Sequence, residues 1–101
     1  MNRDEVVAIL KYQKHRYFPA PLSHWSLDET ERRFFVRISI DILIERLSDD
    51  EDWINYKIII KDFINEIDDM ASSKTQNWRA YAETRDALND ILLDLERMEL
   101  Q

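Results

Sequence analysis

The chain of 101 residues contains no glycine, although glycine makes up about 7% of an average protein. Phosphate-binding loops and dinucleotide-binding turns need glycine so that the backbone can approach the ligand. Two-residue β-hairpins use it for positive φ. The sequence therefore disfavours both these nucleotide sites and a sheet built from tight hairpins, and an all-α fold becomes the natural expectation.

Four segments begin with a helix-capping pattern, in which a Ser or Asn is followed three residues later by Glu or Gln. In this pattern the cap side chain accepts a hydrogen bond from a free backbone N–H, and the second residue reaches back to the cap's own N–H. The pairs are Asn2 with Glu5, Ser26 with Glu29, Ser48 with Glu51, and Ser73 with Gln76. We predict a single domain, residues 1–101, with helices over residues 3–16, 27–47, 49–70 and 74–98.

The predicted helix over residues 27–47 carries two apolar stripes at a spacing of about 100° per residue. One stripe contains Val36, Ile40, Leu43, Ile44 and Leu47, and the other contains Phe35, Ile38 and Ile42. A helix that is apolar on two sides is expected to pack on two sides. The other two long helices each carry one wide apolar face, which we extend to Met70 and Met98. The predicted architecture is a four-helix bundle-like arrangement with helix 27–47 in the centre.

Negative charge is concentrated in the second half of the chain. The formal net charge of −7 divides into +1 over residues 1–47, −6 over 48–70, +1 over 71–77 and −3 over 78–101. Because phosphate binding needs positive charge, this balance argues against direct binding of nucleic acid. A basic protein surface is the complementary partner.

Cysteine is also absent, which excludes disulfides, thiolate zinc sites and a thiol nucleophile. The N-terminus begins with charged residues instead of the apolar run of a signal peptide. The most hydrophobic stretch, FFVRISIDILI, is too short and too polar to cross a bilayer. We expect a cytoplasmic protein with no membrane partner.

Residues 49–52 are four consecutive acids, which precede the apolar run WINYKIII. A calcium loop needs ligands at alternating positions and a glycine at the sixth, whereas this segment has no glycine and turns apolar at its fifth residue. In the first turn of a helix, each acid is stabilised by about 0.3–1 kcal/mol. We therefore interpret the acids as the start of helix 49–70, with a partner surface as the alternative.

The polar side of helix 49–70 carries two isoleucines, Ile54 and Ile58, among carboxylates. Apolar anchors inside a charged rim are typical of protein-binding surfaces. Helix 74–98 adds a ladder of aspartates at residues 86, 90 and 94. The alternatives are a core position for the isoleucines and a solvated face for the aspartates. We predict no catalytic, cofactor-binding or metal-binding residues, and a partner-binding surface formed by Ile54, Ile58, Asp62, Glu66, Asp69, Asp90 and Asp94.

A magnesium site is the enzymatic alternative. All-α nucleotide pyrophosphohydrolases hold magnesium with Glu-x-x-Glu and Glu-x-x-Asp ladders, and residues 66–69 and 83–86 resemble the second of these patterns. No Glu-x-x-Glu occurs upstream, so the resemblance covers half of the motif. Di-metal sites in four-helix bundles use Glu-x-x-His pairs, and neither His15 nor His24 follows a glutamate at that spacing.

Stoichiometric recognition of another protein is the function that the sequence favours. In size, acidity and lack of catalytic residues, the chain resembles small inhibitor proteins as a class. We expect an immunity protein or antitoxin that neutralises a basic toxin, for example a nuclease with a cationic cleft. The alternative is a regulatory adaptor or a phage-type inhibitor that mimics the charge of DNA. The sequence also allows a homodimer.

Overall fold

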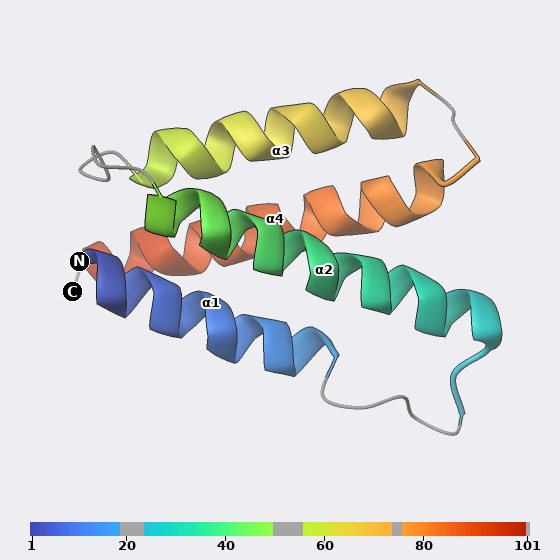
Figure 1. The fold of residues 1–101 in the computed structure, drawn as a ribbon, viewed down its shortest axis with the longest axis horizontal. Helices are drawn as coiled ribbons and strands as arrows, with labels where there is room; N and C mark the ends of the chain where they lie inside the picture. The colour runs from blue at the N-terminus through green and yellow to red at the C-terminus, as the bar shows by residue number, and fades with distance from the viewer. Residues whose placement is uncertain (19–23, 50–55, 74–75, 101) are drawn as a thin grey trace.

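The chain folds into helices, as the spacing of its apolar residues predicts (Figure 1). In the computed structural model, residues 1–18, 24–49, 56–73 and 76–100 are described, and they form four helices and no strand. The predicted all-α bundle is confirmed. The helices are α1 (Arg3–Tyr17), α2 (Leu27–Asp49), α3 (Tyr56–Ser72) and α4 (Trp78–Glu99).

Two of the predicted helix caps form as the sequence indicates. The Asn2 side chain accepts a hydrogen bond from the backbone N–H of Glu5 at 2.9 Å. At the start of α2, the Ser26 hydroxyl accepts one from the N–H of Glu29 at 3.0 Å. Each cap satisfies a backbone donor that the first helical turn would otherwise leave free, so both helices begin where the sequence places them.

The other two predicted caps are wrong. Ser48 lies inside α2, and its hydroxyl donates to the carbonyl oxygen of Ile44 at 2.8 Å. Ser73 follows α3, where its hydroxyl donates to the carbonyl of Met70 at 2.8 Å. Asp49 is the last residue of α2 rather than the first of the next helix. The acids at 50–52 lie outside the described residues.

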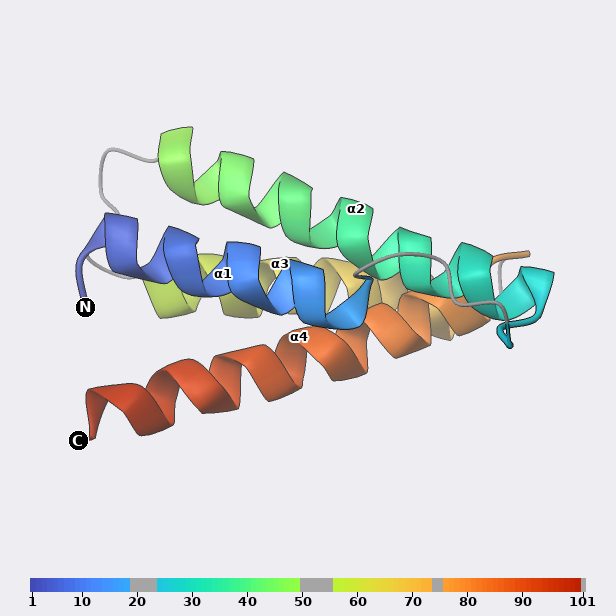
Figure 2. The ribbon, with the colours of Figure 1, turned by 90° about the horizontal axis from the view of Figure 1, so that it is seen from below.

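The helices α2 and α4 form a central pair, with α1 on one side and α3 on the other (Figures 1 and 2). The central position predicted for α2 is confirmed, because this helix contacts all three others. The sequence does not indicate that α4 shares this position. Contact between α2 and α3 is much less extensive than that between α3 and α4, and Figure 1 shows α2 and α3 diverging toward the start of α2.

One continuous apolar core fills the space between the helices, and all four helices contribute to it. Burying a large aliphatic side chain stabilises the folded state by about 1.5–3 kcal/mol. The buried cluster contains Val6, Leu10, Val36, Ile40, Leu43, Leu47, Tyr56, Ile60, Phe63, Ile64, Ile67, Ala87, Leu88, Ile91, Leu92 and Leu95. Within the described residues, no helix combines the length and the apolar character needed to cross a membrane.

Several residues predicted to face the core lie at the surface instead. Ile38 and Ile42, from the second stripe of α2, are each 41% exposed. Phe35 of the same stripe is partly buried and packs on α4 through an edge-to-face contact with Tyr81 at 4.8 Å between ring centroids. α2 is packed on two sides by α1 and α4, but its divergence from α3 leaves these isoleucines uncovered. Met70 and Met98, near the ends of their helices, are also partly exposed.

Candidate functional site

The outward side of α3 presents an apolar residue among polar ones. Ile58 is 54% exposed, so it does not belong to the core. Asp62, Asn65 and Asp69 are exposed at spacings of four, three and four residues, which place them on the same side of the helix as Ile58. We call these four residues the α3 outer face. Ile54 lies outside the described residues.

The α3 outer face carries two carboxylates that are not held in ion pairs. Among the described residues, neither Asp62 nor Asp69 takes part in an ion pair. The opposite side of α3 is buried through Ile60, Ile64 and Ile67. A helix held by such a buried face keeps its outward side chains in a fixed arrangement. The face is therefore carried by a helix that is fixed on the core, and its two carboxylates form no ion pair among the described residues, although the exposed Lys61 lies beside Asp62 on the same helix.

Glu66 lies at the border of this face, turned toward α2. Its carboxylate is 2.8 Å from the Arg46 guanidinium, which also lies over the ring of Phe63 at 4.8 Å from the centroid. The ion pair joins α2 to α3 at the point where the two helices are still close. Because Arg46 compensates its charge, Glu66 contributes less to attracting a cation than Asp62 or Asp69 does.

Asp90 and Asp94 lie on the other side of α4, toward α1. Asp94 accepts a hydrogen bond at 3.4 Å from the side chain of Gln13, which is buried, and lies 4.0 Å from Arg16. On the side toward α3, Arg85 instead pairs with Asp68 at 2.8 Å. Residues 85 and 94 are about two and a half helical turns apart, so they project in opposite directions.

The structure therefore places the acidic residues of α3 and those of α4 on separate surfaces. The α3 outer face brings Ile58, Asp62 and Asp69 together, with Glu66 at its edge. Asp90 and Asp94 line grooves that Tyr17 shares. Burial, and next the charge of Asp90, raises the pKa of the Tyr17 hydroxyl above its usual 10.0.

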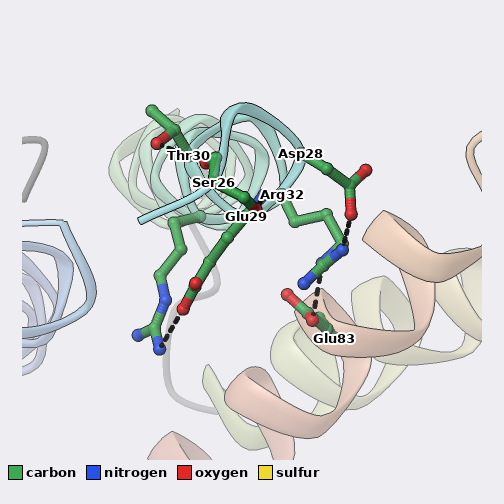
Figure 3. Close-up of polar contacts among 7 residues, drawn as sticks. Ser26, Asp28, Glu29, Thr30, Arg32 and Glu83 are labelled. Atoms are coloured by element: carbon green, nitrogen blue, oxygen red, sulfur yellow. Dashed lines mark hydrogen bonds and ion pairs between the residues drawn. The ribbon is translucent and has the colours of Figure 1, made fainter. Parts of the chain in front are cut away.

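The groove between the end of α1, the start of α2 and the middle of α4 has a volume of about 250 Å³. Its charges are largely paired. Arg32 of α2 lies 2.8 Å from Glu83 of α4 and also pairs with Asp28 (Figure 3). Arg33 is 3.6 Å from Glu29. These pairs tie α2 to α4 and stabilise the start of α2, which is a structural role that the sequence patterns do not indicate.

The geometry does not support the two Glu-x-x-Asp segments as a common magnesium site. Glu66 pairs with Arg46, and Glu83 pairs with Arg32. These arginines are fourteen residues apart on α2, which corresponds to about 21 Å along the helix axis. The two glutamates are therefore held too far apart to bind one ion. In the described part of the chain, no three His, Cys, Asp or Glu side chains form a group suited to a metal ion.

A polar cluster at the end of the bundle has a measurable consequence for stability. The Glu99 carboxylate accepts hydrogen bonds from Lys57, at 2.6 Å, and from the Tyr56 hydroxyl. The Lys57 bond, followed by the Tyr56 bond, lowers the pKa of Glu99 below its usual 4.5. Because the folded-state pKa is the lower one, the stabilisation is complete above the usual value and is lost as the pH falls through the folded-state pKa.

We expect Glu99→Gln to lower the melting temperature at pH 7 and to make stability less dependent on pH below pH 5. The amide keeps the shape of the side chain but removes the ionisable group and its attraction to Lys57. Thermal melts at pH 7, 5 and 3 test this. The matched control is Glu45→Gln, because Glu45 is exposed and forms no ion pair among the described residues. The same pH dependence in both variants would contradict the assignment.

Comparison with known proteins identifies no relative. No protein-family model, curated protein or solved structure matches the chain. Function must therefore be argued from the surfaces of the molecule itself. Of the surfaces that the sequence predicted, the α3 outer face is the one that combines an exposed apolar side chain with unpaired charge.

Proposed function

We propose that the protein is a stoichiometric inhibitor of a basic protein, acting as an immunity protein or antitoxin, and that the α3 outer face contacts the partner. The observation that carries the proposal is the exposure of Ile58 beside two unpaired carboxylates, Asp62 and Asp69. The net charge of −7 adds a long-range attraction for a cationic surface.

Each part of this face has a distinct physical role in the proposed complex. The carboxylates of Asp62 and Asp69 attract lysine and arginine side chains and so accelerate association. Ile58 loses its contact with water when it enters an apolar depression of the partner, which slows dissociation. Because α3 is packed on the core, little conformational entropy is lost on binding.

A toxin that acts on nucleic acid offers a suitable target, because its cleft carries positive charge for phosphate groups. The inhibitor acts by occupying that cleft or an adjacent surface. This mechanism needs no catalytic group on the inhibitor. It requires one inhibitor molecule for each toxin molecule, and inhibition is reversed when the complex dissociates.

Mimicry of DNA by the inhibitor is less well supported. Each strand of DNA carries one negative charge per 3.4 Å of helix axis, whereas Asp62 and Asp69 are about 10 Å apart along α3. The aspartate ladder of α4 is more closely spaced, but Asp86 pairs with Arg85 and Asp94 lies near Arg16 and Arg97. A face with one apolar anchor and few charges favours specific recognition of a protein.

Capture of a partner from the native host tests the proposed function. With the purified chain as bait, we expect a single basic protein to be retained in equal stoichiometry and to lose its activity in the complex. Rising salt should slow association while leaving a basal affinity that is due to Ile58, because screening acts on exposed charges. A complex that dissociates fully at moderate salt would instead support charge mimicry. Capture of no basic protein, or of one that stays fully active in the complex, would contradict the proposal.

A further inference from the structure

A second apolar surface follows the outward side of α2. Phe34, Ile38 and Ile42 are 47%, 41% and 41% exposed and are spaced four residues apart, so they lie in one row along the helix. Met70 of α3 is also 41% exposed. We call these four residues the α2 stripe. Isolated surface apolar residues are common, but a row of three over two helical turns forms a continuous patch.

Met70 places a fourth exposed apolar side chain on the neighbouring helix α3. The Arg46–Glu66 ion pair fixes the two helices against each other. Ile42 lies one turn before Arg46, and Met70 lies one turn after Glu66. Because α2 and α3 run in opposite directions (Figure 1), Ile42 and Met70 both lie on the side of the ion pair toward which the helices diverge.

The charged residues around the α2 stripe indicate what kind of partner can bind there. Glu31 and Glu45, one turn beyond either end of the row, are exposed and form no ion pair among the described residues. On the α3 side lie the unpaired Asp62 and Asp69. Of the nearby cations, Arg46 pairs with Glu66, whereas Arg37 lies over the ring of Phe18 at 5.7 Å from the centroid and forms no ion pair among the described residues. The four carboxylates without an ion pair therefore outnumber the one arginine without an ion pair.

This rim argues against a second copy of the chain as the occupant. In a symmetric dimer, the same surface of each copy meets the other, so the acids of the two rims would face each other and repel. A partner with positive charge beside its apolar residues satisfies both parts of the surface. The row spans about 12 Å along α2, which matches two turns of a helix.

We propose that the α2 stripe binds an amphipathic, basic α-helix of the partner, with apolar residues at i, i+3 or i+4, and i+7 toward the stripe and lysine or arginine at its edges. This inference rests on the proposed function, because it names the element of the basic partner that is recognised. The flexible Met70 side chain adapts to the residue it meets, while Ile38 and Ile42 provide the rigid part of the contact.

Two synthetic peptides test this docking site. The two peptides have the same length and the same leucine and lysine content. In one, the leucines recur at helical spacing, and in the other the same residues are in scrambled order. Titrated into the isotope-labelled chain, the amphipathic peptide should shift the signals of Phe34, Ile38, Ile42 and Met70, and it should bind roughly tenfold more tightly than the scrambled one. Equal binding of the two peptides, or shifts centred away from these residues, would overturn the proposal.

Matched variants separate this site from general attraction between charges. Ile42→Ser should weaken binding of the amphipathic peptide roughly tenfold, while Leu93→Ser on α4, where the side chain is 49% exposed, should leave it unchanged. Circular dichroism melts establish that both variants fold. An unchanged affinity for folded Ile42→Ser would show that the stripe is not the docking site.

The same variants distinguish failure of this inference from failure of the proposed function. If a basic protein captured from the host binds Ile58→Asp much more weakly than wild type but binds Ile42→Ser with wild-type affinity, the stripe proposal is wrong and the proposed function stands. If no basic protein is captured by the wild-type chain, the proposed function fails, and the peptide titration still decides whether the stripe binds a cationic helix.

Discussion

Replacement of Ile58 by aspartate should leave the fold intact and lower the affinity for a basic partner by roughly thirtyfold or more, which is the loss typical of a central anchor. Ile58 is 54% exposed on α3, so the new carboxylate remains in water in the free protein. In the complex it would be placed in the depression that receives the isoleucine. Thermal melts and isothermal titration with the captured partner measure the two effects.

Leu93→Asp is the matched control for Ile58→Asp, because Leu93 is 49% exposed on the outward side of α4. It adds the same charge and removes a similar apolar side chain far from the α3 outer face. We expect its affinity to stay within about twofold of wild type, since surface changes away from a contact have small effects. Equal losses in both variants would mean that added charge, not the loss of an anchor, weakens the complex.

Replacement of Leu43 by alanine should lower the free energy of unfolding by about 2–5 kcal/mol, because it removes buried methyl groups and leaves a cavity. Leu43 is fully buried in the cluster shared by the four helices. In a domain of this size, the loss corresponds to a fall in melting temperature of roughly 10 °C or more. Urea denaturation and thermal melts measure both quantities.

The control for the core prediction is Leu27→Ala, at the first position of the same helix. Leu27 is 77% exposed, so its truncation should change stability by no more than about 0.5 kcal/mol. The difference between the two variants tests the packing assigned to α2. A small loss for Leu43→Ala would contradict that packing.

Most of the fold could be predicted because local chemistry and periodicity agree over most of the chain. The row of Val36, Ile40, Leu43 and Leu47 is buried as predicted, because packing against other helices removes these apolar side chains from water. The Asn2 and Ser26 caps form at the starts of α1 and α2, where each side chain accepts a hydrogen bond from the N–H three residues later, as the local pattern predicts.

The boundary between α2 and α3 could not be predicted from the same signals. Ser48 and the acids after it match a capping pattern, but α2 continues through Ser48 to Asp49. Leu47 is buried, so the last turn of α2 is held by packing, and the Ser48 hydroxyl bonds back to the carbonyl one turn earlier. A capping pattern is local, whereas the end of this helix depends on contacts with other helices.

In the candidate site too, features set by one helix could be predicted, whereas features set by contacts between helices could not. The outward position of Ile58 follows from the spacing of apolar residues along α3. The separation of Asp94 from the α3 outer face does not, because it depends on which side of α4 meets α1 and which meets α3. Likewise, the exposure of Ile38 and Ile42 follows from the divergence of α2 and α3, an angle between helices that no stretch of sequence specifies.

The most direct test of the proposed function is titration of the captured partner's activity with the purified chain. The proposal predicts that activity falls in proportion to the inhibitor added and reaches its minimum at one equivalent, and that Ile58→Asp shifts this curve to higher concentrations. Full activity of the partner in the presence of excess wild-type chain would contradict the proposal that this protein is an inhibitor.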